Sequence, residues 1–146
     1  MQRILVLVAA VAGALAFLPQ GAHAQQALTG NWSGPVETRP GGGRTSMSVF
    51  LDRPQDGTSD GFVRFGAPQT CRIDLKFLTV DSDARIFKVV GTSPSGFCKG
   101  YRFGDFSARP AAEGCSIDVT LAPHPSLTGP EGTRTVRASL PCHNSP

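Results

Sequence analysis

Apolar and polar residues alternate along several short segments of the chain, and most of these segments end at a cluster of Gly, Pro, Asp or Ser. In the clearest case, residues 71–77, the side chains of Ile73, Leu75 and Phe77 fall on one side, and Arg, Asp and Lys stand between them. A period of two is typical of a strand with one buried face. The pattern predicts strands over residues 30–37, 44–52, 62–66, 71–77, 85–91, 101–108, 115–122 and 133–140.

The connections between these strands are rich in turn-forming residues, as in "TRPGGG", "RPQDGTSDG" and "PHPSLTGPEG". No segment outside the N-terminus shows a convincing helical period. Eight short strands joined by polar turns favour an all-β fold, and we predict an antiparallel up-and-down barrel of about eight strands. A β-sandwich is the alternative architecture for the same pattern.

The four cysteines occur in two similar arrangements. "CRIDLKF" begins at Cys71 and "CSIDVTL" at Cys115, and each cysteine is followed 27 positions later by another, Cys98 or Cys142. The midpoint of each pair falls at a turn, and residues equidistant from the turn of an antiparallel hairpin lie close enough for a disulfide. We therefore predict Cys71–Cys98 and Cys115–Cys142 among the three possible pairings, with a structural role.

Residues 1–24 are typical of a secretory signal peptide. Arg3 precedes an apolar run over residues 4–18, and the small-x-small sequence Ala-His-Ala at 22–24 provides a cleavage site. We expect removal of this segment, which leaves a single domain over residues 25–146. An even number of cysteines in the exported part favours disulfides in an oxidising compartment, either the bacterial periplasm or the medium outside the cell.

Charge and composition narrow the classes of partner. The chain has 14 basic and 11 acidic residues, and one of the basic residues, Arg3, belongs to the signal segment. The remaining basic residues are scattered and form no concentrated basic face of the kind that nucleic acids require. We expect no nucleic-acid partner, no membrane association after signal removal, and a monomer.

One short motif resembles a known group of proteins. The sequence "ALTGNWSG" contains Gly30 and Trp32, and it is similar to the Gly-x-Trp opening of calycin-type barrels, which include lipocalins, avidins and small bacterial periplasmic inhibitors. The resemblance implies that Trp32 closes one end of a barrel and stacks under an arginine near the last strand, Arg134 or Arg137. Biotin binding is not expected, since the avidin cup contains several tryptophans and this chain has one.

No set of residues predicts catalysis. A nucleophile needs a base and a group that orients the base, and the exported part has only His124, in a turn, and His143, near the end. Asp74 and Asp118 occupy matching places in the two repeats, and we expect them to form cross-strand ion pairs. The other aspartates considered lie in turns, where Asp favours the backbone geometry without a ligand: Asp56, Asp60, Asp81 and Asp83. We predict no enzyme activity, no metal site and no cofactor.

Two functions remain. The first is an exported, non-enzymatic binding protein, such as an inhibitor of a hydrolase, that presents loops from a disulfide-stapled barrel to a protein partner. Arg39 and Arg44, which flank three glycines, are the predicted contacts with an acidic cleft. The alternative is a carrier that holds a small ligand inside the barrel. Aromatic side chains that could instead fill the interior are Phe65, Phe77, Phe87, Tyr101 and Phe103.

Overall fold

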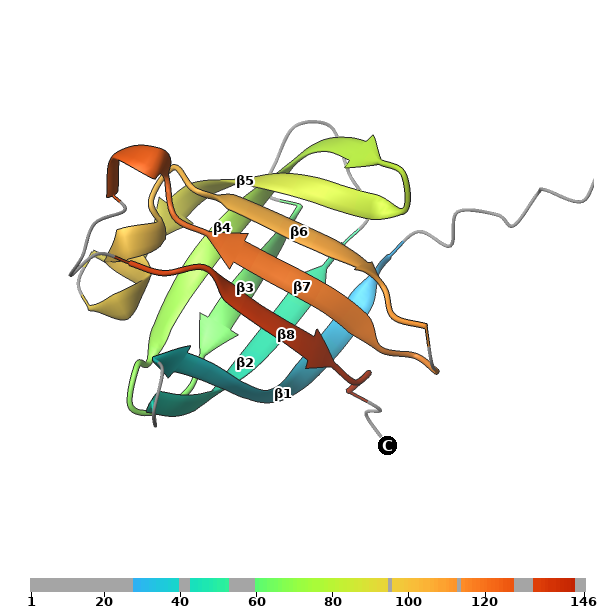
Figure 1. Ribbon diagram of the computed structural model, residues 1–146, viewed down its shortest axis with the longest axis horizontal. Helices are drawn as coiled ribbons and strands as arrows, with labels where there is room; N and C mark the ends of the chain where they lie inside the picture. Colours follow the sequence, from blue (N-terminus) through green and yellow to red (C-terminus); the bar gives the residue numbers. More distant parts are fainter. Residues whose placement is uncertain are drawn as a thin grey trace, which may run out of the picture.

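The computed structural model describes residues 28–39, 43–52, 60–94, 96–112, 114–127 and 133–143 (Figure 1). The predicted signal segment lies outside the described residues. The described part forms one eight-stranded sheet, in chain order from the first strand to the last. Its strands are β1 (Gly30–Arg39), β2 (Gly43–Leu51), β3 (Gly61–Phe65), β4 (Cys71–Asp81), β5 (Ala84–Thr92), β6 (Asp105–Pro110), β7 (Ile117–Ala122) and β8 (Val136–Leu140).

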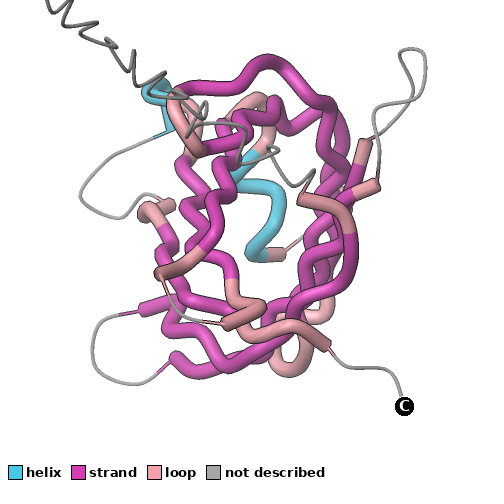
Figure 2. The backbone as a smooth tube through the Cα atoms, turned by 90° about the vertical axis from the view of Figure 1, so that its right-hand side faces the viewer, coloured by secondary structure: helices cyan, strands magenta, loops and turns pink. Residues whose placement is uncertain are grey.

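Each strand pairs antiparallel with the next one along the chain, so the topology is up-and-down. The sheet curls until β1 reaches β8, where Trp32 forms an isolated antiparallel bridge with Cys142. The strands surround one interior in the view of Figure 2, and a short helix lies within their ring. The predicted all-β, eight-stranded barrel is confirmed, and the β-sandwich alternative is not what the chain adopts.

Side chains that alternate along the strands fill the interior of the barrel. In β2, for example, Met47, Val49 and Leu51 are fully buried, and the residues between them face outward. The same alternation in the other strands builds one continuous hydrophobic core. The largest fully buried side chains are Tyr101, Phe65, Phe87, Phe106, Met47, Leu51, Ile73, Leu75, Ile117, Leu121, Leu140 and Val49.

The predicted strand over residues 101–108 differs from the structure in its first half. Tyr101 ends the short 3-10 helix η1 (Phe97–Tyr101), and β6 begins only at Asp105. Phe103 has a φ of 62° and an exposed fraction of 57%, so it does not share a buried face with Tyr101. The backbone N–H of Gly104 donates to the carbonyl of Tyr101 at 2.9 Å, which turns the chain here and prevents an extended path.

Helix η1 closes one end of the barrel. Tyr101 and Cys98 are fully buried, and the Tyr101 hydroxyl donates to the backbone carbonyl of Arg134 at 2.7 Å. The Phe97 ring packs edge-on against Tyr101 and Phe65, with ring centroids about 5 Å apart. A helix that inserts aromatic side chains into the end of the barrel removes space that a carrier would keep for its ligand.

Both predicted disulfides are present. Cys71–Cys98 joins the start of β4 to η1, and Cys115–Cys142 joins the segment before β7 to the segment after β8. The Cα atoms are 5.9 and 5.4 Å apart, within the range that a disulfide requires. Each bridge therefore spans one hairpin, and the two bridges lie at opposite ends of the barrel. No described helix is long and apolar enough to cross a membrane.

Replacement of Tyr101 by Phe tests the closure by η1. We expect a loss of about 1 kcal/mol in the free energy of unfolding, because the Arg134 carbonyl loses its donor. Burial raises the pKa of Tyr101 above its ordinary value of 10.0. As the pH rises, Tyr101 therefore loses its phenolic proton at a lower pH in the unfolded chain than in the folded protein. The stability that Tyr101 provides should then fall as the pH rises above 10.0.

Denaturant titrations of both proteins from neutral to alkaline pH measure this effect. The stability difference between the wild type and Tyr101→Phe should shrink at alkaline pH. A difference that stays constant with pH would contradict a buried, protonated Tyr101.

The two disulfides should differ in their resistance to reduction. Cys71 and Cys98 are both buried, whereas Cys115 is exposed and Cys142 is half-buried. A reducing thiolate must reach a sulfur atom, so Cys115–Cys142 should open at a lower concentration of reductant. Alkylation of the native protein followed by peptide mass spectrometry checks the order. If Cys71 or Cys98 were labelled before Cys115 and Cys142, the end of the barrel closed by η1 would open more readily than the structure implies.

Candidate interaction surface

His124 and His143 lie beyond the ends of two antiparallel neighbouring strands, and the hydrogen bonds described for their imidazoles are with serines. His124 Nδ1 is 2.8 Å from Ser126 Oγ in the turn after β7, and His143 Nδ1 is 3.3 Å from Ser33 Oγ beyond the end of β8. No described contact joins either imidazole to a carboxylate. The structure therefore does not bring together a nucleophile, a base and an orienting acid from these residues.

The matching aspartates of the two repeats make different ion pairs. Asp118 lies opposite Arg109 across β6 and β7, with Asp118 Oδ2 and Arg109 Nε 3.8 Å apart, as the cross-strand prediction states. Asp74 instead accepts from Arg72 Nε on its own strand at 2.7 Å. Among the described residues, no group of three His, Cys, Asp or Glu side chains is arranged to hold a metal ion.

Asp60 is a structural residue and not an exposed turn residue. It is buried, and its carboxylate Oδ2 accepts from the backbone N–H of Phe77 at 2.7 Å, where β4 extends beyond its pairing with β3. The carboxylate thereby satisfies a donor at the free edge of β4. Of the other predicted turn aspartates, Asp56 lies outside the described residues, and Asp81 and Asp83 lie at the tip of the β4–β5 hairpin.

Trp32 closes the end of the barrel opposite η1. Its ring is buried, its Nε1 donates to the carbonyl of Cys115 at 3.1 Å, and it covers Gly30. Gly30 has a φ of 139°, which favours glycine, and an added Cβ would lie 3.5 Å from the indole. The arginines predicted to stack on Trp32 are elsewhere, since Arg134 lies near η1 and Arg137 is exposed on β8 opposite Thr120. The described cation–π contacts do not include the Trp32 ring.

Arg85 is the arginine buried near this end, and the sequence prediction missed it. Its side chain donates to the carbonyl of Leu28 at 2.9 Å and lies over the rings of Phe77 and Phe87, 5.0 and 5.6 Å from their centroids. Burial lowers the pKa of the guanidinium, and the charge of Asp60 opposes this effect. The sequence contains one signal that could have identified it. Arg85 falls on the same side of the alternating β5 pattern as the buried Phe87 and Val89.

An aromatic and arginine cluster lies on the outer face of the barrel. Phe50 of β2 and Phe62 of β3 stack with ring centroids 5.3 Å apart, and both are half-buried. The guanidinium carbons of Arg64 and Arg72 lie 5.7 and 4.1 Å from the centroid of the Phe62 ring. We call Phe50, Phe62, Arg64, Arg72 and Asp74 the Phe62 cluster.

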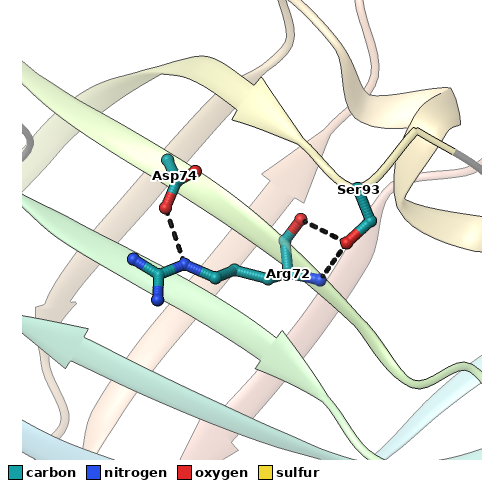
Figure 3. A network of polar contacts seen from close by, with 3 residues as sticks. All are labelled: Arg72, Asp74 and Ser93. Atoms are coloured by element: carbon teal, nitrogen blue, oxygen red, sulfur yellow. Dashed lines mark hydrogen bonds and ion pairs between the residues drawn. The ribbon is translucent and has the colours of Figure 1, made fainter.

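Arg72 of the Phe62 cluster is held at both its side chain and its main chain (Figure 3). Asp74 accepts from the guanidinium, and Ser93 Oγ accepts from the Arg72 backbone N–H at 2.9 Å. Gly91 lies opposite Asp74 on β5, where an added Cβ would be 3.0 Å from Asp74 Oδ2. Glycine at this position therefore leaves room for the carboxylate that orients Arg72.

The surface around the Phe62 cluster is also partly apolar. An open groove beside the cluster is lined by Arg64, Phe65, Gly66, Thr70, Cys71, Arg72 and Ser93. The neighbouring β4–β5 hairpin exposes Leu78, Val80 and Val90, with exposed fractions of 59%, 44% and 54%. Three of the five exposed large hydrophobic residues of the described chain thus lie on this hairpin. Val90 adjoins Gly91, which pairs with Asp74, whereas Leu78 and Val80 lie toward the tip of the hairpin. Exposed apolar area beside oriented arginines, as at Val90, is typical of a protein-binding surface.

The predicted contacts Arg39 and Arg44 lie at the ends of β1 and β2. Both are exposed, and Arg44 Nε is 3.7 Å from the Glu37 carboxylate on the paired strand. Residues 40–42 of the predicted loop lie outside the described residues. The two arginines flank this loop but do not form part of the Phe62 cluster.

No protein-family model matches the chain, and neither the curated proteins nor the solved structures contain a match to it.

Replacement of Arg85 by Met tests the buried arginine near the Trp32 end. We expect a loss of about 2 kcal/mol in the free energy of unfolding, because the Leu28 carbonyl loses a charged donor and Asp60 loses a nearby positive charge. Chemical denaturation measures this loss. Arg137→Met, on the exposed face of β8, is the matched control and should change stability by less than about 0.5 kcal/mol. Equal stability of the two variants would show that burial costs Arg85 as much as its contacts contribute.

Proposed function

We propose that the protein is an exported, non-enzymatic binding protein that holds a macromolecular partner on its outer surface through the Phe62 cluster. The observation that carries the proposal is an oriented set of aromatic and arginine side chains outside a barrel whose interior is packed. Aromatic residues and Arg are enriched among the residues that dominate the energy of protein interfaces.

The arrangement of the cluster supports a recognition role by its rigidity. Arg72 is held by Asp74 and by the main-chain contacts of Ser93, and Cys71 beside it is bonded to Cys98. A side chain that is already ordered loses less conformational entropy when a partner binds. The Phe62 ring lies under two guanidinium groups and beside the Phe50 ring, so rings and cations form one surface that a partner can cover.

A carrier function has less support than a surface function. Among the described residues, twelve large side chains inside the barrel have an exposed fraction below 2%, and η1 and Trp32 occupy the two ends of the barrel. A lipocalin-like carrier would need an interior space for its ligand. The absence of catalysis is likewise part of the proposal, and the separation of the two histidines supports it.

Two disulfides are typical of proteins in oxidising compartments, which supports export. We place the protein in the periplasm or outside the cell, where hydrolases that act on envelope components are a suitable class of partner. Inhibition of such a hydrolase is one form that the binding could take.

Capture experiments with the immobilised mature protein, read by mass spectrometry, should recover a protein partner from envelope or extracellular extracts. Arg64→Ala should weaken the Kd for that partner about tenfold or more, because Arg64 lies over Phe62 and makes no ion pair in the described structure. Its melting temperature should stay close to that of the wild type. Isothermal titration calorimetry measures the Kd.

The matched control is Arg109→Ala, an exposed arginine of β6 that is paired with Asp118 and lies outside the Phe62 cluster. It should bind the partner as the wild type does. The double variant Arg39→Ala/Arg44→Ala tests the contact predicted from the sequence in the same assay. Wild-type affinity of Arg64→Ala would exclude the Phe62 cluster as the binding surface, and stoichiometric binding of a small apolar ligand would favour the carrier.

A further inference from the structure

Two arginines of the Phe62 cluster lie directly opposite each other. Arg64 of β3 pairs in register with Arg72 of β4, and both side chains are exposed on the outer face of the barrel. The Cβ atoms of directly opposed residues in an antiparallel pair lie about 5 Å apart, and like charges at such positions destabilise the sheet. The register therefore brings two positive charges together on the surface, although their repulsion opposes folding.

Three other cations of the barrel have an acid directly opposite. Each of these cross-strand pairs forms an ion pair: Glu37–Arg44, Lys88–Asp105 and Arg109–Asp118. Lys76 and Lys88 are a second pair of opposed cations, but there the repulsion is relieved because Lys88 also faces Asp105. The arrangement at Arg64 and Arg72 therefore differs from the usual charge pairing on this surface.

The register offers Arg64 no acidic neighbour. It faces Ser48 of β2 on one side and Arg72 of β4 on the other. Asp74, the one carboxylate of the cluster, accepts from Arg72 Nε at 2.7 Å, and the described structure contains no ion pair of Arg64. Two guanidinium groups and one carboxylate leave the cluster with one positive charge that is not balanced.

The two guanidinium groups keep donors for a ligand. The contact with Asp74 uses Arg72 Nε, which leaves the two terminal amino groups of Arg72 free of that contact (Figure 3). Both arginines also line the open groove beside the cluster, which has a volume of about 420 Å³. A planar guanidinium can bind a carboxylate through two parallel N–H groups. A single carboxylate between Arg64 and Arg72 can therefore contact both.

We propose that Arg64 and Arg72 form a carboxylate-binding site that takes an Asp or Glu side chain of the protein partner. This inference rests on the proposed binding function and names the chemical group that the Phe62 cluster recognises. The incoming carboxylate balances the remaining positive charge and relieves the repulsion between the two arginines. An apolar residue beside it in the partner covers Val90, which is 54% exposed next to the residue opposite Asp74.

Charge and ring packing distinguish a carboxylate from other anionic ligands. Asp74 lies beside Arg72 and repels the second negative charge of a phosphate monoester, whereas a carboxylate matches the one unbalanced positive charge. The Phe62 ring lies between the Phe50 ring of β2 and the guanidinium of Arg72 of β4. Both faces of the ring are thus covered, which disfavours stacking of a sugar ring or a nucleobase on it. These features favour an acidic peptide segment.

An NMR titration of the ¹⁵N-labelled mature protein with acetyl-Val-Glu-Val-amide tests the site, and acetyl-Val-Gln-Val-amide is the matched neutral probe. The guanidinium Nε–H signals of Arg64 and Arg72 should shift and saturate with the Glu peptide. The Gln peptide should bind about tenfold more weakly, because it lacks the charge. Equal binding of the two peptides, or the absence of shifts up to about 5 mM Glu peptide, would overturn the inference.

The matched variants are Arg64→Gln and Arg109→Gln. Arg64→Gln removes one of the two guanidinium groups and should weaken binding of the Glu peptide about fivefold or more. Arg109 is paired one-to-one with Asp118, so Arg109→Gln should bind the peptide as the wild type does. Wild-type affinity of Arg64→Gln for the Glu peptide would contradict the role of Arg64.

Asp74→Asn tests the charge balance. The wild type should bind acetyl-Val-phosphoserine-Val-amide no more tightly than the Glu peptide. Asp74→Asn adds one positive charge to the site, so the ratio of the two affinities should move about tenfold toward the phosphoserine peptide. A wild type that already prefers the phosphoserine peptide would be a site for dianions, which would overturn the choice of a carboxylate.

The outcomes separate this inference from the proposed function. If Arg64→Ala weakens binding of the captured partner but the Glu and Gln peptides bind equally, the surface function stands and the carboxylate site fails. If the Glu peptide binds at Arg64 but the captured partner does not depend on Arg64, the carboxylate site stands and the proposed function fails. Tighter binding of a galacturonate trimer than of the Glu peptide would assign the site to an anionic glycan and overturn the choice of a protein.

Discussion

Burial of the inward-facing side chains of all eight strands in a single interior is the interaction on which the rest of the structure depends. A sheet with one apolar face must cover that face, and this sheet covers it by curling on itself. The barrel is short, so its ends also need closing, and Tyr101 and Trp32 close them from opposite sides. The two disulfides hold these closures, since one joins η1 to β4 and the other lies at the carbonyl that Trp32 contacts.

Because side chains fill the interior of the barrel, a binding site has more room on its outer surface than inside it. Among the described residues, the two histidines are separated from each other, and Asp74 and Asp118 are paired with arginines. One surface feature remains that ordinary packing does not require. It is the Phe62 cluster, where rings and guanidinium groups are stacked outside the core, and such a surface suits side-chain recognition.

The sequence by itself determined the fold class and the disulfide pairing. Alternation with a period of two needs no knowledge of long-range contacts, because each strand shows its buried face locally, as Ile73 and Leu75 do in β4. The pairing of Cys115 with Cys142 agrees with equal distances to a turn, since the register pairs Ile117 with Leu140. The pairing of Cys71 with Cys98 was predicted in the same way and is present, but Cys98 lies in η1 beyond the end of β5 and not opposite Cys71 in the hairpin register. The ion pair of Asp118 was predictable for the same reason, because neighbouring strands of a meander are neighbours in sequence.

Only the tertiary structure decided how the barrel ends are built and where the barrel closes. The contact of Arg85 with Leu28 joins residues 57 positions apart, and no local pattern selects it over Arg134 or Arg137. The sequence around Tyr101 alternates like a strand, but its burial at the end of the barrel and the turn at Gly104 make it part of η1. The bridge of Trp32 with Cys142 is likewise set by closure of the whole sheet, because the phase of a strand edge has meaning only once its neighbour is known.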